Sequence, residues 1–183
     1  AVRRMQAANR AHDPGTPPAA PSAGGCPGLR THVRERNDTP APAQPGAGGQ
    51  AIRSDLDQWP VQLHLVQPGA PYFRNRELVV LSTCAPVASA DVHWRFLRGR
   101  SVVVACPKLD RTDPYADKLS AILAESSIPR VVVVRMEVPC CGGLTRIVRQ
   151  AVKKSGRDDI ESEEVVVGVQ GDVLGRKRLQ QDG

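Results

Sequence analysis

The sequence predicts an α/β domain over residues 51–175, built on an open, doubly wound (flavodoxin-like), mostly parallel sheet of four to five strands. Two observations lead to this fold class. Continuous runs rich in β-branched residues recur along the chain, as is typical of strands that are buried on both faces. Stretches of helical period lie between these runs, and right-handed crossovers through such helices place successive strands parallel in one sheet.

Four runs of mainly Val and Leu are expected to form the strands, at residues 78–83, 101–105, 130–136 and 164–169. Before them, Val61–Val66 alternates apolar and polar residues as a half-exposed strand does. The acidic residues between 158 and 164 are interpreted as an exposed connector.

Three helices are expected between the strands. Residues 91–97 form a short helix that Gly99 ends, and Asp113–Pro114 begins a second helix that continues to about Leu123. The third helix has the clearest pattern, because its apolar residues recur at i, i+3, i+4, i+7 and i+8 and Gly156 follows as a C-terminal break. These apolar residues are Leu144, Ile147, Val148, Ala151 and Val152.

The two ends of the chain differ in composition from this domain. Residues 1–50 contain eight Pro and seven Gly but few large aliphatic side chains, so we expect a disordered Pro/Gly/Ala-rich segment. Residues 176–183 are expected to form a basic, flexible tail. The net charge of +6 is mild and no aromatic residues interleave with the basic ones, so nucleic-acid binding is not favoured. Without a long apolar run or a signal-peptide core, we expect a soluble, cytoplasmic protein with no membrane partner.

Four of the five cysteines stand directly after predicted strands. Cys84 follows the first run, Cys106 the second, and Cys140 and Cys141 the third. In an open α/β sheet the ligand crevice lies outside the carboxyl ends of the strands. We therefore expect thiols from three separate loops to meet at one edge of the sheet.

Thiolates are soft ligands that suit iron–sulfur clusters, zinc or copper(I). The third helix is expected to begin near Cys141, where its free N–H groups would favour an ionised sulfur. Gly142 and Gly143 lack a Cβ and would let the backbone approach a bound group. The same arrangement also suits a dithiol–disulfide pair, which would join Cys140 or Cys141 to one of the more distant thiols because adjacent cysteines bridge only with strain.

Other interpretations of these residues stay open. Buried cysteine is also a common small apolar core residue. The Gly pair lacks the spacing of a phosphate-binding loop. His93 could approach the thiols or lie elsewhere on the surface or in the core, and Lys108 and Asp110 could charge the rim of the crevice or belong to a solvated loop.

Several longer strings in the chain resemble the α/β part of a family of bacterial and archaeal ferredoxin-like iron–sulfur proteins. The resemblance runs from about residue 24 to 173, and its most specific strings are QWPVQLHLV and RMEVPCCGG. The segments that carry it are Gly25–Gly28, Gln58–Val66, Ala70–Phe73, Ala105–Asp110 and Val134–Leu144.

The resemblance implies electron transfer or iron–sulfur binding, with a ferredoxin module of four-iron clusters preceding the α/β domain. The C-x2-C-x2-C-x3-C-P run of such a module is absent from this sequence. We therefore expect either a fragment or degenerate member of the family, or a protein whose cluster depends on the thiols named above. Cys26 matches the family's short GGCPG segment and is interpreted as an unconstrained loop residue rather than a fifth ligand.

These observations predict a 4Fe-4S or other thiolate-metal protein of ferredoxin type that transfers electrons to a redox partner protein. The predicted ligands are Cys84, Cys106, Cys140 and Cys141, and the basic faces of the third helix and the tail are expected to dock an acidic partner. No catalytic set for transforming a substrate is visible. Two alternatives stay open: a thiol–disulfide redox protein, and a non-catalytic partner module that binds zinc or no metal.

Overall fold

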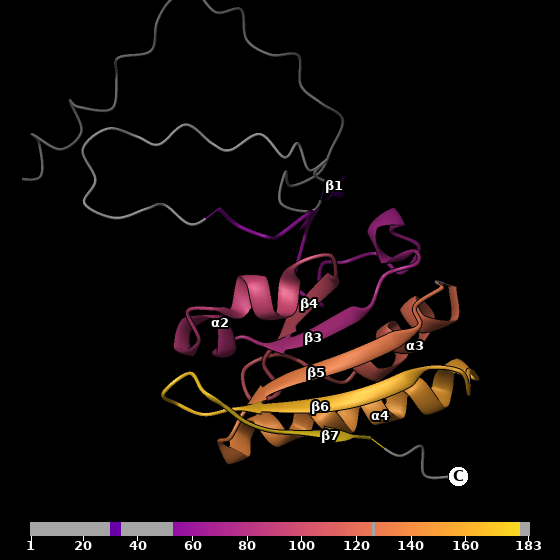
Figure 1. Cartoon of the computed structure of the whole chain (residues 1–183). Helices are drawn as coiled ribbons and strands as arrows, with labels where there is room; N and C mark the ends of the chain where they lie inside the picture. Colours follow the sequence, from indigo (N-terminus) through magenta and orange to yellow (C-terminus); the bar gives the residue numbers. More distant parts are fainter. Residues whose placement is uncertain (1–29, 34–52, 126, 180–183) are drawn as a thin grey trace, which may run out of the picture.

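The computed structural model describes residues 30–33, 53–125 and 127–179 (Figure 1). The predicted disordered segment at residues 1–50 lies outside these ranges apart from residues 30–33. The main sheet has five strands in the order β4-β3-β5-β6-β7. Their bounds are β3 (Leu78–Ser82), β4 (Ser101–Ala105), β5 (Arg130–Met136), β6 (Glu161–Val167) and β7 (Val173–Arg178).

The strand order confirms the predicted fold class. β3, β4, β5 and β6 run parallel, and β7 pairs antiparallel with β6 at the edge. The chain goes from β3 outward to β4 and then returns to the other side of β3 to form β5. The strand order therefore reverses between β3 and β5, and ligands of open α/β sheets bind at the carboxyl ends of strands at such a switch point.

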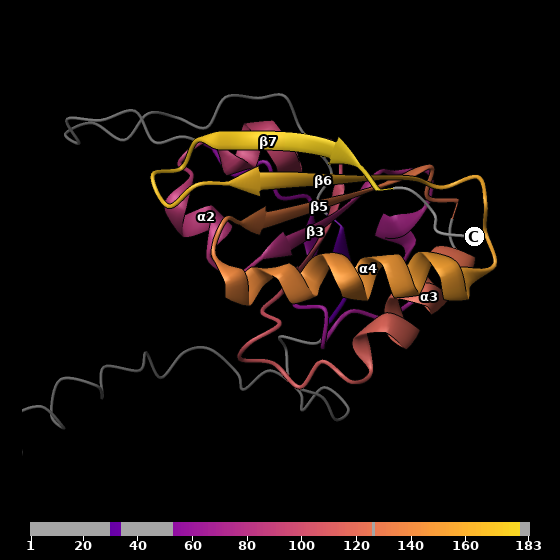
Figure 2. The ribbon, with the colours of Figure 1, turned by 90° about the horizontal axis from the view of Figure 1, so that it is seen from below.

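Helices cover the sheet on both faces. α3 (Tyr115–Glu125) and α4 (Gly142–Ser155) pack together on one face, where they share a core with alternate residues of β3 and β5 (Figure 2). The other face is covered by α2 (Ala85–Ala88) and by η3 (His93–Leu97), a short π-helix. None of the described helices is both long and apolar enough to cross a membrane.

The helix predictions agree with the structure. The stretch predicted to be helical over 91–97 contains η3, and α3 and α4 occupy the other two predicted positions. Gly99 and Gly156, which were expected to end two of these helices, have φ values of 72° and 70°. Glycine enters this left-handed region without the steric cost that a Cβ imposes.

The predictions of an exposed acidic connector and of a flexible basic tail are both wrong for the residues that the structure describes. β6 begins at Glu161, so the last part of the acidic run is strand, and Glu163 and Glu164 are buried. The basic residues 176–178 belong to β7. Their side chains pair with the glutamates of β6, and these cross-strand ion pairs explain why two oppositely charged segments form a ladder. The pairs are Arg176–Glu163, Lys177–Glu164 and Arg178–Glu161.

The strand expected over Val61–Val66 is also wrong. Gln62 makes one isolated parallel bridge with Val104 of β4, and the chain then turns, with the Leu65 and Val66 N–H groups donating to the Gln62 carbonyl. Upstream, β2 (Gln58–Trp59) pairs with β1 (His32–Val33). The amide of Gln58 bonds both the N–H and the carbonyl of Val102, so a side chain satisfies this edge of the sheet.

Candidate functional site

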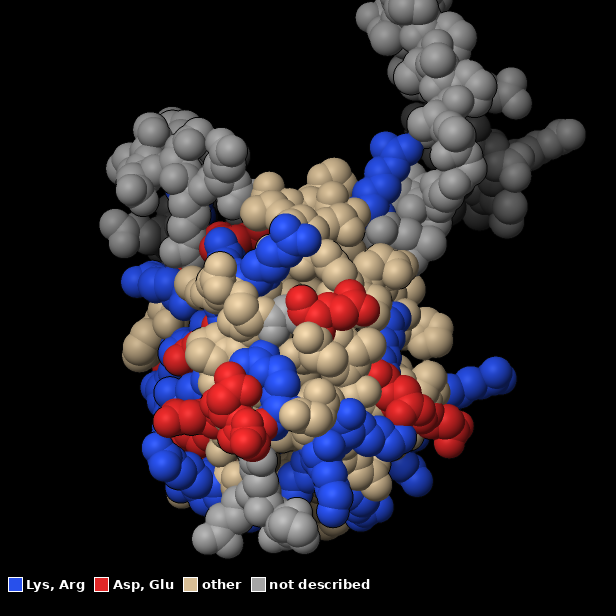
Figure 3. Space-filling model, turned by 90° about the vertical axis from the view of Figure 1, so that its right-hand side faces the viewer, with Lys and Arg blue, Asp and Glu red and all other residues tan. Residues whose placement is uncertain are grey.

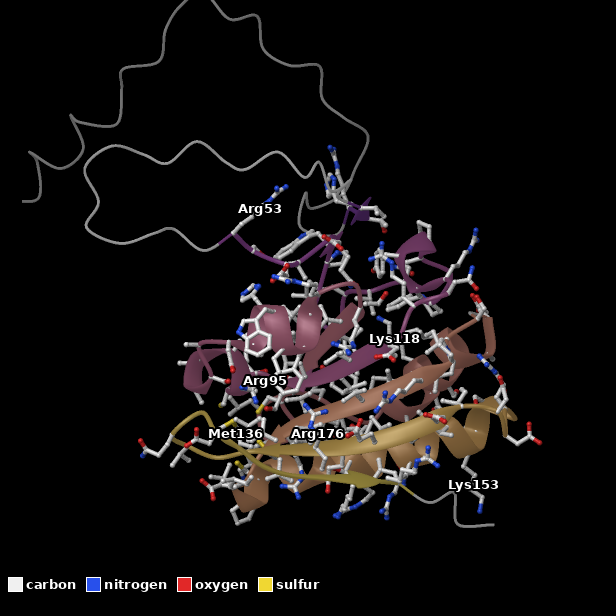
Figure 4. All side chains as sticks on the ribbon, in the orientation of Figure 1. Arg53, Arg95, Lys118, Met136, Lys153 and Arg176 are labelled. Atoms are coloured by element: carbon white, nitrogen blue, oxygen red, sulfur yellow. The ribbon has the colours of Figure 1, made fainter. Side chains whose placement is uncertain are left out.

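The four predicted thiols lie in the loops at the carboxyl ends of three neighbouring strands. Cys84 is the residue before α2, Cys106 follows β4, and Cys140 and Cys141 lie in η4 (Pro139–Cys141), directly before α4. All four are free thiols. Cys84 and Cys140 are exposed, Cys106 is partly buried, and Cys141 is buried. Figure 4 places Met136 at this edge, where the sulfur atoms drawn in yellow gather.

Cys141 is the anchor of the group. Its side chain is 4% exposed and packs in the core beneath α2 with Met136 and Ala85. Burial raises the pKa of the Cys141 thiol, a backbone hydrogen bond with Met136 lowers it, and charge and hydrogen bonding with Cys140 and the charge of Cys84 raise it again. Cys140 and Cys84 therefore lie close enough to Cys141 to disfavour its ionisation.

The direction of this pKa shift differs from the expectation for a sulfur at a helix N-terminus. Cys141 precedes Gly142, the first residue of α4, as predicted. The favourable field of the helix N-terminus is outweighed, because a thiolate here would be both desolvated and close to two other sulfurs. As a result the thiol is held in its neutral form over a wider pH range.

A packing contact brings the loop of Cys106 to the start of α4. A Cβ on Gly143 would lie 3.0 Å from Cβ of Pro107, so the absence of a side chain at Gly143 lets Pro107 pack against the helix. The space that the missing Gly143 side chain leaves is thus filled by Pro107 rather than by a bound group. By contrast, a Cβ on Gly142 would meet nothing within 4 Å.

Asp110 holds the same loop in place through two hydrogen bonds. Its Oδ2 accepts hydrogen bonds from the backbone N–H of Cys106 at 2.8 Å and from the hydroxyl of Tyr115 at 2.9 Å. Burial raises the pKa of Tyr115, and the hydrogen bond and charge of Asp110 and the charge of Cys106 raise it further. Asp110 is therefore a structural acceptor under the loop, whereas Lys108 is exposed at the rim.

The four thiols are chemically suitable metal ligands, but they are not arranged as a metal site in this structure. Four thiols from three loops provide the soft donors that iron–sulfur clusters, zinc and copper(I) prefer. Yet among residues 30–33, 53–125 and 127–179, no three His, Cys, Asp or Glu side chains lie close enough together to hold a metal ion as they stand. Ligation by this set would therefore require the thiols to move closer together, and Cys84 and Cys140 are the exposed ones. His93 does not join the thiols, since its Nδ1 lies 3.5 Å from Oγ of Ser54.

A buried ion cluster that the sequence analysis missed fastens the first turn of α4 to β6. Thr145 donates its hydroxyl to Oε1 of Glu164 at 2.5 Å, and Nε of Arg135 donates to the same oxygen at 2.8 Å. Nζ of Lys177 lies 2.9 Å from the other oxygen. Burial alone would raise the pKa of Glu164, but these three partners outweigh it and hold the pKa at about 2. The sequence signal was the position of Thr145 in the first turn of an otherwise apolar helix face.

Comparisons with known proteins agree with this fold. Residues 70–182 match the model of a family described as "Rossmann-like domain". An uncharacterized protein from Archaeoglobus fulgidus is 34% identical over 119 residues, which is 65% of this chain and 83% of that protein. No solved structure matches.

Proposed function

Because the chain belongs to the Rossmann-like domain family and has thiols at the switch point of its sheet, we propose that it holds a thiolate-ligated redox centre there and transfers electrons. The first choice of centre is a 4Fe-4S cluster on Cys84, Cys106, Cys140 and Cys141. The observation that supports it is the position of the four thiols at the carboxyl ends of three neighbouring strands, with Cys140 and Cys84 near the buried Cys141. The proposal includes a cytoplasmic location, because reducing compartments keep thiols free.

Electrostatics supports a cationic guest at this edge. Several thiolates at close range repel one another, and burial of Cys141 adds a desolvation cost to ionisation. A soft cation or an iron–sulfur cluster offsets both costs, because it replaces the protons of the thiols and bonds to the sulfurs. An iron–sulfur cluster, when bound, supplies a one-electron couple whose potential depends on burial and on hydrogen bonds to the sulfurs.

The protein's own residues would hold and shield such a centre. Cys141 presents its sulfur from a packed position, so it would fix one corner of the site. Asp110 and Pro107 hold the loop of Cys106 against α4. Met136 lies beside Cys141 in an apolar core, and such a lining lowers the local dielectric and excludes water.

The test is anaerobic purification followed by analysis of iron, sulfide and zinc and by an absorption spectrum. We expect about four iron and four sulfide per chain after reconstitution and a broad visible absorption band, for a cluster of this type. Cys140→Ser combined with Cys141→Ser should lose both. Cys26→Ser is the matched control, because it removes a thiol that lies outside the described residues, and it should keep them. A colourless, metal-free protein that remains folded after reconstitution would contradict the proposal.

A second candidate is a dithiol–disulfide couple, which needs only two sulfurs. The absence of a ready group of three ligands among the described residues favours it. Cys84 would bridge to Cys140 or Cys141 as the two thiols give two protons and two electrons to a disulfide substrate, which becomes two thiols. This candidate predicts a reversible two-electron couple in metal-free protein. The third alternative, a non-catalytic module, predicts tightly bound zinc or no metal, without visible absorption and without such a couple.

A further inference from the structure

Most basic side chains of the described domain are neutralised by a neighbouring carboxylate. Arginines on β5, on η3 and between η3 and β4 pair with aspartates and glutamates, as in Arg130–Glu163, Arg95–Asp91 and Arg100–Glu77. The cations of β7 also pair, each with a glutamate of β6. Figure 3 shows the end of the molecule where the parallel strands begin, and there acidic and basic side chains are intermixed.

A second group of cations differs from these. Within the part of the chain that the structure describes, its members have no carboxylate within 4.0 Å, and all of them are exposed. Five of them lie on α4 or in the loop after β4, namely Lys108, Arg111, Arg146, Arg149 and Lys153, and we call these five the unpaired cations. Arg74 is also exposed without a carboxylate partner, but it precedes β3 at the opposite end of the sheet. The three on α4 are spaced as neighbours along one helix face, and α4 contains no acidic residue. These charges are therefore available to an external partner.

The unpaired cations form one surface that begins at the thiols. Pro107 packs on Gly143, so the loop with Lys108 and Arg111 lies against the first turn of α4. Arg146 follows within the next turn of α4, and the row continues to Lys153 at the far end of the helix, where its side chain points away from the sheet (Figure 4). The positive surface thus extends from the thiol edge along the outer face of α4.

Two aliphatic side chains are exposed beside the thiols. Val87 is 88% exposed and stands three residues after Cys84, while Leu109 is 83% exposed and stands three residues after Cys106. They lie on opposite sides of the edge, one on α2 and one in the loop against α4. Exposed aliphatic side chains that flank the thiols, with cations beside one of them, are features of a docking surface.

We propose that an acidic redox protein docks on this surface, with its carboxylates against the unpaired cations and an apolar patch against Val87 and Leu109. The redox character of the partner rests on the proposed function, whereas its acidic character rests on the unpaired cations. The β7 cations, which the sequence analysis assigned to the same role, contribute little because the β6 glutamates already offset their charge. None of the residues that define this surface, the unpaired cations with Val87 and Leu109, is aromatic and could stack on bases, which favours a protein partner over a nucleic acid.

The test measures association of the full chain with an immobilised acidic ferredoxin used as the probe. Lys108→Gln combined with Arg146→Gln removes two unpaired cations. Lys154→Gln combined with Arg178→Gln removes two paired ones, Lys154 with Asp117 and Arg178 with Glu161, and serves as the control of equal charge. We expect the first variant to lower the association rate about 10-fold at low ionic strength and the control to change it less than about twofold, because steering depends on local charge.

Three results would overturn the proposal: no association of the unaltered chain at low ionic strength, equal effects of the two variants, or tighter binding of a single-stranded oligonucleotide than of the ferredoxin. The Cys140→Ser, Cys141→Ser variant separates this inference from the proposed function. If this variant associates normally with the ferredoxin but iron analysis finds no cluster in the unaltered protein, the docking surface is supported and the iron–sulfur proposal fails. If the unaltered protein binds iron but its association with the ferredoxin does not depend on Lys108 and Arg146, the iron–sulfur proposal is supported and the docking surface fails.

Discussion

Replacing Glu164 by Gln should reveal how strongly its ion cluster stabilises the fold. The carboxylate is 3% exposed and has hydrogen-bond or ionic contacts with Arg135, Thr145 and Lys177. The substitution keeps the shape of the side chain and an acceptor for Thr145. It removes the negative charge that Arg135, which is 19% exposed, and the exposed Lys177 face, so the largely buried Arg135 loses its ionic partner.

The magnitude follows from the pKa of Glu164, which is about 2 in the folded chain against an ordinary value of 4.5. A shift of this size corresponds to about 3 kcal/mol of folding stability at neutral pH, as an upper estimate. Because the folded pKa is the lower one, the contribution is complete well above pH 4.5 and is lost as the pH falls toward 2. At pH 3 about 2 kcal/mol of it should already be gone.

The assay is urea unfolding of the unaltered protein and of Glu164→Gln at several pH values between 7 and 3. The difference between their free energies of unfolding should be largest at pH 7 and should shrink by most of its value at pH 3. Glu161→Gln is the matched control on the same strand, since Glu161 is 59% exposed and its pairing with Arg178 is a surface contact. It should cost less than about 1 kcal/mol. A Glu164→Gln difference that does not change with pH would refute this reasoning.

Two further predictions concern the contacts that hold the loop of Cys106, one with the first turn of α4 and one with Asp110. Gly142→Ala should raise the melting temperature, because its Cβ meets open space and Ala is the better helix former, whereas Gly143→Ala should lose this gain through its 3.0 Å approach to Pro107. Equal melting temperatures would argue against that contact. Asp110→Asn should lower the pKa of Tyr115, since the charge and hydrogen bond of the carboxylate help to raise it. Absorbance of the phenolate during a pH titration measures this pKa, and an unchanged value would exclude Asp110 as a cause.

The sequence predicted the central strands because their signal is local. Runs such as Arg130–Met136 contain four successive valines, and such a run is typical of a strand covered on both faces. β7 was missed because Val173–Arg178 contains Gly175 and three cations and has no such run. Its place in the sheet depends on the glutamates of β6, and this is a pairing between segments that local composition does not reveal.

The position of the thiols was predictable from the sequence, but their electrostatics was not. The rule that ligands meet the carboxyl ends of strands was enough to place Cys84, Cys140 and Cys141 at one edge. The burial of Cys141 was not predictable, because it depends on α2, whose four residues give no helical period. The contact between Pro107 and Gly143 was hidden for a similar reason, since it joins a loop to the first turn of α4, 36 positions further along the chain.

The buried ion cluster and the thiol edge are mechanically linked through α4. Thr145 lies four residues after Cys141, one helical turn away, and its bond to Glu164 ties this turn to β6. Gly143, between them, is the point where the loop of Cys106 packs. Displacement of the first turn would therefore move Cys141 and release Pro107 at the same time. A site assembled from exposed, rotatable thiols keeps its geometry only if its buried member is held rigidly, and the charges of Glu164 and its partners supply that rigidity one turn along the helix from Cys141.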